Sequence, residues 1–240
     1  MNNFNIVSVA IGEQYEKEVA RLVEAYPTTI VITSETAKVE TAFTIPTLNG
    51  LATKCKFGLL IPENLKGPII FCDADLYPVV EDPLQYFGVK PETDIAYVTY
   101  GGTWHFPEKL KKFEQCIQKT GKINSGFIYF KNLDVCRDIC FEWHKEYLTR
   151  MSHYLSAESM SSDVIDWTSH LDEATPRAGE YDEPSLVFVL DKANYNLEFL
   201  DPRWNVWDDY GDLKKNAYFI QSHLDGKTMY DEIPNFRNEA

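Results

Sequence analysis

Two short apolar runs, separated by a helical repeat, open the chain. Residues 5–10 (NIVSVA) are rich in β-branched side chains, and residues 28–33 (TTIVIT) form a second run of the same kind. Between them apolar side chains recur at the spacing of one buried helical face. They are Tyr15, Val19, Leu22, Val23 and Tyr26. Strand, helix and strand in this order predict the βαβ opening of an α/β sheet.

The same pattern continues along the chain. Further strands are predicted at residues 68–72 (PIIFC), 94–100 (DIAYVTY) and 125–130 (SGFIYF), and helices at 109–119 and 133–150. Residues 185–190 (SLVFVL) are buried as helix or strand, and the polar stretch 151–183 is predicted to be an irregular loop. No Gly/Ser-rich or Pro-rich linker interrupts the pattern. We therefore predict one α/β domain over 1–240, with a central, mainly parallel sheet and helices on both faces.

The charge of the chain restricts its partners. Asp and Glu number 37 against 23 Lys and Arg, which gives a formal net charge of −14. Proteins that bind a nucleic-acid backbone usually present a basic stripe that replaces counterions. The longest basic cluster here is Lys109, Lys111 and Lys112, which a solvated helix face explains. The charge argues against duplex DNA or RNA, while a small anionic ligand is compatible with it if a metal supplies the positive charge.

The cysteines and the hydropathy bear on the compartment. The five cysteines are odd in number and lack any CxxC spacing, which favours buried free thiols in a reducing compartment. No apolar run approaches the ~18 residues that a membrane span needs. The start of the sequence, Met1-Asn2-Asn3-Phe4, lacks the basic residues of a secretory signal. These features predict a cytoplasmic protein, or a domain separated from a membrane anchor.

An acidic pair directly after an apolar strand is the strongest chemical signal. Residues 69–72 run into Asp73 and Asp75, two carboxylates at the carboxyl end of a strand, where open α/β sheets bind ligands. A turn there brings both carboxylates to one hard cation, Mg²⁺ or Mn²⁺, which also takes diphosphate oxygens. A bare Asp-x-Asp arises about once by chance in so acidic a chain. Its place after a buried strand favours function, because adjacent carboxylates repel each other unless something compensates them.

Three blocks of the sequence resemble glycosyltransferases of the GT-A fold. Residues 68–78 (PIIFCDADLYP) resemble their metal-binding strand end. Residues 123–132 (INSGFIYFKN) and 219–227 (FIQSHLDGK) are similar to later motifs of the family that includes glycogenin and bacterial lipooligosaccharide galactosyltransferases. The blocks occur in the family's order. The resemblance implies a metal-dependent glycosyltransferase that retains the anomeric configuration.

The resemblance also implies roles for the metal-binding and phosphate-binding residues. His223 would be the third ligand, beside Asp73 and Asp75, of a cation for which this mix of donors favours Mn²⁺ over Mg²⁺. In the family's His-x-x-Gly motif, a lysine after the glycine contacts the diphosphate; here the glycine is Gly226. Lys227 follows Gly226 directly, and the Lys-Pro-Trp with which the family motif usually continues is absent. For His223 the alternative is an ordinary hydrogen-bonded histidine.

Other candidates would bind the nucleotide or the sugar. Lys54 stands where the family places a basic residue against the diphosphate, and a solvated surface lysine is the alternative. Tyr15 is a candidate for stacking on the base, or else a core aromatic of the helix. Asn124, Ser125 and Gly126 would let a sugar approach and hold its hydroxyls, or else form a tight turn before a strand. The candidates are completed by Asp182 and Glu183, the nearest match to the family's sugar-binding Asp-Gln pair, with Glu183 a possible nucleophile.

These expectations define a reaction and two alternatives. The donor is a nucleotide-diphosphate sugar, with UDP or GDP as the nucleotide, and the acceptor is a glycan or another small hydroxyl compound. A nucleotidyltransferase that makes nucleotide sugars would normally have a Gly-rich loop after the first strand, whereas residues 10–14 (AIGEQ) hold one glycine and an acid. A non-catalytic module that binds glycans or nucleotide sugars is the second alternative.

Overall fold

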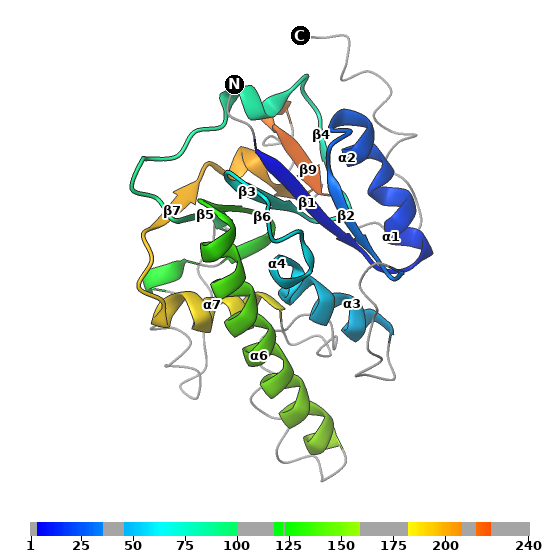
Figure 1. Cartoon of the computed structure of the whole chain (residues 1–240), viewed down its shortest axis with the longest axis vertical. Helices are drawn as coiled ribbons and strands as arrows, with labels where there is room; N and C mark the ends of the chain where they lie inside the picture. Colours follow the sequence, from blue (N-terminus) through cyan, green and yellow to red (C-terminus); the bar gives the residue numbers. More distant parts are fainter. Residues whose placement is uncertain are drawn as a thin grey trace.

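Six strands form the central sheet, in the order β2-β1-β3-β6-β5-β7 (Figure 1). The structure is a computed structural model that describes residues 4–35, 46–99, 118–121, 123–158, 182–207 and 215–221. The strands are β1 (Asn5–Ala10), β2 (Ile30–Thr33), β3 (Ile69–Cys72), β5 (Ile95–Thr99), β6 (Ile123–Phe130) and β7 (Leu197–Leu200). Strand β6 pairs antiparallel with β3 and β5, and the other described pairs of this sheet are parallel. The carboxyl ends of β1, β3 and β5 therefore share one edge.

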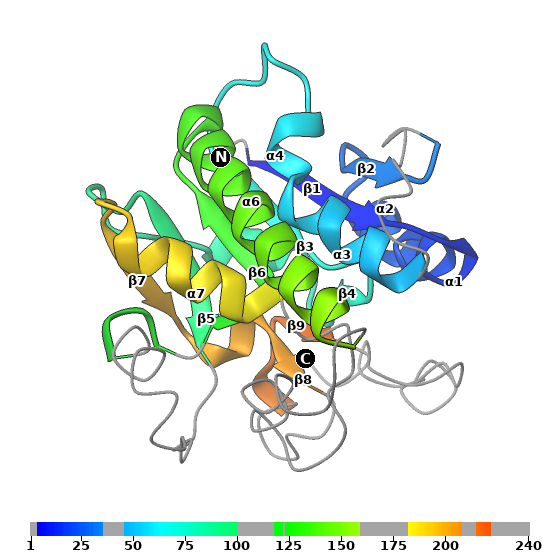
Figure 2. The same ribbon diagram turned by 90° about the horizontal axis from the view of Figure 1, so that it is seen from below.

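Four helices cover one face of the sheet (Figure 2). They are α3 (Pro46–Cys55), α4 (Phe57–Leu60), α6 (Leu133–Glu158) and α7 (Asp182–Lys192). Their buried side chains pack on the strand residues that point to this face, such as Phe71 and Phe130. Trp143 of α6 is fully buried in this core.

The other face carries α2 and a second, smaller sheet. Helices α1 (Glu13–Glu18) and α2 (Ala20–Ala25) follow β1. The small sheet has the order β4-β9-β8, with β4 (Leu76–Pro78), β9 (Phe219–Gln221) and β8 (Val206–Trp207). Two short 3-10 helices, η1 (Pro83–Tyr86) and η4 (Pro202–Trp204), complete the layer. Aromatic side chains fill it, with Phe127 and Trp204 at a ring distance of 5.5 Å.

The predicted fold class is confirmed, because the central sheet is mostly parallel and lies between two layers. The five strands predicted at 5–10, 28–33, 68–72, 94–100 and 125–130 are all present, with small shifts of their ends. The helical repeat from Tyr15 to Tyr26 is α1 and α2, which join at Val19. The stretch 185–190 is helical, as part of α7.

The predicted loop at 151–183 is wrong at both of its ends. Helix α6 continues to Glu158, since residues 133–158 contain neither glycine nor proline to stop it. Asp182 and Glu183 open α7, where acidic side chains favour the positive end of the helix dipole. Residues 159–181 lie outside the described residues, as does most of the helix predicted at 109–119.

The described cysteines are buried and free, as predicted. They are Cys55, Cys72, Cys136 and Cys140, while Cys116 lies outside the described residues. Burial raises the pKa of Cys55 and Cys72, which keeps both thiols protonated and unreactive. In the described ranges, no helix combines the length and the hydrophobicity that crossing a membrane requires.

Gly58 offers a test of the packing between α4 and α6. A Cβ at this position would lie 2.8 Å from Cys136 Sγ and 2.9 Å from Cys140 Sγ. Alanine usually stabilises a helix interior relative to glycine, but here we expect Gly58→Ala to lower the free energy of unfolding by about 1–3 kcal/mol through overpacking. Urea unfolding measures this. Gly88→Ala is the control, because a Cβ there meets nothing within 4 Å; equal stability of the two variants would contradict the described packing.

Candidate active site

Two carboxylates meet at the carboxyl end of β3. Asp73 follows the strand directly, and the Leu76 N–H donates to the Asp73 carbonyl oxygen at 3.0 Å, which closes a turn. The turn brings Asp75 to the same side as Asp73. One donor then serves both, because Gln221 Nε2 lies 3.1 Å from Asp73 Oδ2 and 3.3 Å from Asp75 Oδ1. An amide N–H₂ shared in this way holds the two acidic groups close together without neutralising them.

The electrostatics of this pair favour a cation. Burial, and then the charge of Asp73, raise the pKa of Asp75 to about 7, although Lys54 and Gln221 act in the opposite direction. A carboxylate that resists ionisation beside a second carboxylate indicates an excess of negative charge in a poorly solvated place. A divalent cation bound between them would relieve that excess.

Lys54 links this pair to the start of α7. From the last turn of α3, its Nζ lies 2.9 Å from Asp73 Oδ1, 2.9 Å from Asp182 Oδ2 and 2.9 Å from Ser125 Oγ. The residue is only 8% exposed, so a solvated surface lysine, the alternative left open by the sequence, is wrong. Burial works against its charge, but Asp182 and Asp73 outweigh burial and raise the pKa of Lys54, which stays protonated.

Asp182 and Glu183 converge on the middle of the same cluster. Ser125 N donates to Glu183 Oε1 at 2.9 Å, and Ser125 Oγ donates to Asp182 Oδ2 at 3.0 Å. The indole of Trp143 donates to the Asp182 carbonyl oxygen at 2.7 Å, which fixes the start of α7 against α6. Residues more than fifty positions apart in the sequence therefore form one polar cluster with Asp73.

Asn124, Ser125 and Gly126 lie within β6, so the tight turn considered as their alternative is wrong. The register jumps at this point, because Tyr97 of β5 pairs with Ile128 while the next residue, Val98, pairs with Asn124. The residues of β6 between these two pairs are not paired with β5 but remain beside the end of β3. There Asp73 N donates to the Gly126 carbonyl oxygen at 2.9 Å. A bulge of this kind re-aims side chains at the rim of a sheet.

Tyr15 lies at the rim of the site and outside the core. It is 44% exposed on α1, which excludes its alternative as a core aromatic. Burial of part of its ring, and then the charges of Asp75 and Asp73, raise the pKa of Tyr15. The stacking of its ring on a base stays a prediction.

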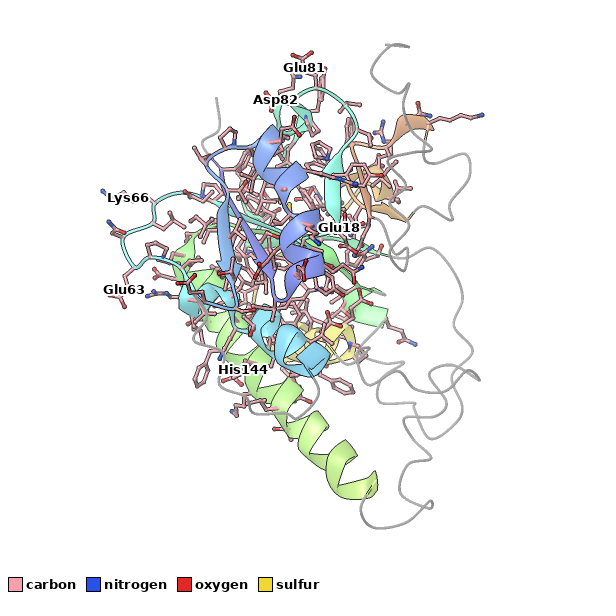
Figure 3. The ribbon with its side chains drawn as sticks, turned by 90° about the vertical axis from the view of Figure 1, so that its right-hand side faces the viewer. Glu18, Glu63, Lys66, Glu81, Asp82 and His144 are labelled. Carbon is pink, nitrogen blue, oxygen red and sulfur yellow. The ribbon has the colours of Figure 1, made fainter. Side chains whose placement is uncertain are left out.

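Three predicted residues, His223, Gly226 and Lys227, lie outside the described residues. Among the described residues, no group of three or more His, Cys, Asp or Glu side chains has the arrangement of a metal site. The histidine whose side chain is described, His144, lies on α6 (Figure 3). The third ligand predicted for the cation therefore stays a prediction.

Two further residues of the cluster were not singled out from the sequence. Gln221 is the last residue of β9, two positions before His223 in the FIQSHLDGK block, and that proximity was a usable signal. Asn205 follows η4, and its Nδ2 donates to Asn124 Oδ1 at 2.6 Å. Nothing local in the aromatic segment around Asn205 marks it as part of a site.

A hollow of about 340 Å³ lies elsewhere, at the start of β7. Lys90, Thr93, Asn196 and Glu198 contribute to its walls. It adjoins the amino ends of β5 and β7, the edge opposite to Asp73, whereas α/β sheets bind ligands beyond the carboxyl ends of their strands. Its Glu198 carboxylate already accepts hydrogen bonds from Thr93 Oγ1 and Lys90 N. We therefore place the site at the carboxylate cluster.

Comparison with known proteins identifies the fold. No protein-family model and no curated protein sequence matches the chain. Among solved structures, it is similar to a glycosyltransferase involved in glycosylation of the major capsid of the virus PBCV-1, with a TM-score of 0.50, 12% identity and 98% of each chain covered. It is also similar to the bifunctional glycosyltransferase WbbM, with a TM-score of 0.50 and 13% identity over 99% of this chain and 50% of that chain. The galactosyltransferase LgtC, in complex with donor and acceptor sugar analogs, gives a TM-score of 0.45 at 11% identity over 93% of this chain and 88% of that one.

The first two likenesses establish that the chain has the GT-A-like α/β fold found in glycosyltransferases. At such low identity a likeness defines the fold and leaves the reaction to be argued from the site.

Replacing each of the two aspartates by asparagine should change the stability of the metal-free protein in opposite directions. Because the folded pKa of Asp75 lies above its unfolded value, the folded state holds the extra proton between about pH 4 and pH 7, and stability falls as the pH rises through this window. In chelator at pH 8, we expect Asp75→Asn to raise the free energy of unfolding by about 1–3 kcal/mol. The gain should vanish near pH 4.

The control is the neighbouring carboxylate. Asp73→Asn should lower the stability under the same conditions, because it takes one of the two carboxylates from the buried Lys54 ammonium. Denaturant unfolding at both pH values measures the two effects. The same sign for both variants would contradict the charge balance described for the site.

Proposed function

We propose that this protein is a metal-dependent glycosyltransferase that uses a nucleotide-diphosphate sugar. The observation that carries the proposal is the pair Asp73 and Asp75, held by Gln221 at the ligand-binding edge of a glycosyltransferase fold. Three further charged side chains belong to the same cluster, because each of them forms a hydrogen bond with Ser125. They are Lys54, Asp182 and Glu183.

The donor set fits a divalent cation. Asp73 and Asp75 offer carboxylate oxygens. Burial, and then repulsion by Asp73, raise the pKa of Asp75, and bound positive charge would oppose both effects. His223 would be the third ligand. A mixed oxygen and imidazole set favours Mn²⁺, with Mg²⁺ as the alternative. When bound there, the cation would neutralise charge on the diphosphate leaving group.

The chain's own residues would bind and orient the donor. Tyr15, exposed on α1, would stack on the base of UDP or GDP. Lys54 and Lys227 would contribute positive charge towards the diphosphate, and Gly226 would allow the chain to approach it. Ser125, at the centre of the cluster, would hold the carboxylates of Asp182 and Glu183 in position to face the sugar.

Asp182 and Glu183 would face the sugar from the start of α7. Ser125 orients both carboxylates, and the Ser125 N–H fixes one oxygen of Glu183. In a retaining reaction, the other carboxylate oxygen of Glu183 would be the nucleophile that attacks the anomeric carbon of the donor sugar. Attack by the acceptor from the same face, with the carboxylates stabilising the positive charge that develops on the sugar, is the second route.

The acceptor would be a glycan or another small hydroxyl compound. A net charge of −14 opposes a polynucleotide acceptor. The described cysteines are free thiols, and all of them are buried. Free thiols are typical of a reducing compartment such as the cytoplasm. We accordingly propose one transferase domain over residues 1–240 that acts in the cytoplasm.

The non-catalytic alternative remains distinguishable by experiment. A module that only binds a nucleotide sugar would use the same carboxylates but would not need Glu183. A nucleotidyltransferase would bind a sugar phosphate and a nucleoside triphosphate instead of the finished donor.

Donor binding tests the metal site. In calorimetric titrations of UDP-glucose, UDP-galactose, UDP-xylose and GDP-mannose with Mn²⁺, we expect one donor to bind and its binding to require the metal. Asp73→Asn and Asp75→Asn should each weaken it at least about tenfold, the scale of one lost charged contact. The control is Asp82→Asn, in the turn before η1 at the top of Figure 3, where the left-handed backbone suits asparagine equally well. No binding of any donor by the wild type would end the transferase proposal.

Turnover tests Glu183. Slow, Mn²⁺-dependent hydrolysis of the bound donor without acceptor reports the chemistry. Glu183→Gln keeps an oxygen to accept the Ser125 N–H, so the fold should survive while hydrolysis falls by about a hundredfold or more. Glu142→Gln, on the exposed face of α6, is the matched control. Unchanged turnover in Glu183→Gln would remove Glu183 as the nucleophile and leave donor binding intact.

A further inference from the structure

Three side-chain amides converge on Gly126, behind the carboxylate pair. A Cβ at Gly126 would lie 2.5 Å from Asn205 Nδ2, 2.8 Å from Gln221 Oε1 and 3.1 Å from Asn124 Oδ1. The three residues come from β6, from the end of η4 and from β9. They are 2%, 4% and 5% exposed in the order Asn124, Asn205, Gln221. Glycine at position 126 leaves the space in which these amides meet.

The orientation of the Asn124 amide follows from a backbone donor. Gly126 N lies 2.9 Å from Asn124 Oδ1, and a backbone N–H can only donate. The oxygen of the Asn124 side chain must therefore face Gly126, whatever the ambiguity of amide groups in general. Asn205 then has to present its NH₂ group to the same oxygen, at 2.6 Å.

Both lone pairs of Asn124 Oδ1 are thereby occupied. The part of Asn124 that remains for a ligand is its NH₂ group, which is a hydrogen-bond donor. Such a group recognises acceptor oxygens, such as the hydroxyl or ring oxygens of a sugar. Without Asn205, one lone pair of Asn124 Oδ1 would be free, and of these two donors only the Gly126 N–H would still hold the amide against rotation.

Asn205 itself ends in an unsatisfied atom. In the described part of the chain, Asn205 Oδ1 is buried and has no hydrogen-bond partner. Leaving a buried acceptor unpaired costs about 1–3 kcal/mol. The asparagine bears this cost, while its NH₂ group makes the contact to Asn124 Oδ1.

We propose that Asn205 is a positioning residue for the donor sugar. It holds the Asn124 amide with its NH₂ group towards the ligand, while the third amide, Gln221, holds Asp73 and Asp75. This inference rests on the proposed function, since it assigns Asn124 to the sugar part of the donor. The nucleotide part, bound at the carboxylates, does not depend on Asn205.

The test compares the affinity for the nucleotide sugar with the affinity for the nucleotide diphosphate alone. For the nucleotide sugar that binds the wild type, and for the matching free nucleotide diphosphate, dissociation constants are measured with saturating Mn²⁺. Asn205→Asp keeps the shape but sets an oxygen against Asn124 Oδ1, and Asn205→Ala removes the contact. In both variants we expect the ratio of nucleotide-sugar affinity to nucleotide-diphosphate affinity to fall about tenfold, the loss of one buried hydrogen bond.

Two controls separate positioning from general damage. In an Asn124→Ala background, replacing Asn205 should produce no further loss of the ratio, because the residue that it positions is gone. Asn132→Asp adds the same charge and keeps its cap at the start of α6, since an aspartate oxygen also accepts the Val135 N–H. It should leave the ratio unchanged.

A structural role alone would weaken nucleotide diphosphate and nucleotide sugar together, or would only lower the stability. Equal loss for the two ligands, an unchanged ratio, or additive losses in the double variant would overturn the positioning role while leaving the transferase proposal standing. If the wild type binds nucleotide diphosphate with Mn²⁺ but no nucleotide sugar, both proposals fail together. These outcomes are therefore distinguishable.

Discussion

Lys54 places one buried positive charge between carboxylates that arrive from distant parts of the chain. Asp73 comes from the end of β3 and Asp182 from the start of α7, and both lie 2.9 Å from the same ammonium. Without this contact, burial of so many acidic groups at one edge of the sheet would cost far more than packing recovers. Helix α3, strand β6 and helix α7 are held in their relative positions by the same cluster. The charge of Lys54 is therefore a condition both of the fold at this edge and of the site.

Acidic side chains gather at this edge from β3 and from the start of α7. Among the described residues, the ammonium of Lys54 contacts Asp73 and Asp182, while Gln221 donates to Asp73 and Asp75, and Ser125 donates to Asp182 and Glu183. Burial, and then the charge of Asp73, raise the pKa of Asp75 at this place. Ionising Asp75 is therefore unfavourable in the absence of a ligand, and the divalent cation proposed above would carry the positive charge that favours it.

Sequence patterns predicted five of the six strands of the central sheet, because these strands contain apolar runs bounded by polar residues. They missed β7, whose short run is interrupted by Glu198. They also located Asp73 and Asp75, since a carboxylate pair after a buried strand is a local signal. The burial of Lys54 and the roles of Gln221 and Asn205 arise from contacts between residues up to 148 positions apart, which no local pattern contains. The length of α6 was underestimated, because the polar character of residues 151–158 outweighed the absence of any helix-breaking residue. The bulge in β6 was also beyond reach, since it depends on which neighbour each half of the strand pairs with.

Two crowded glycines, Gly58 and Gly126, constrain the divergence of this chain in different ways. Around Gly58, the neighbours include a backbone carbonyl, so a larger residue must disturb helix packing. Around Gly126, all three neighbours are the ends of side chains, which can rotate away. A relative that carries alanine at this position could thus keep its strand and its stability while its amides are displaced. Position 126 would then act as a marker in evolution: its side chain would separate descendants that have kept the amide arrangement proposed to bind the sugar from those that have kept only the scaffold.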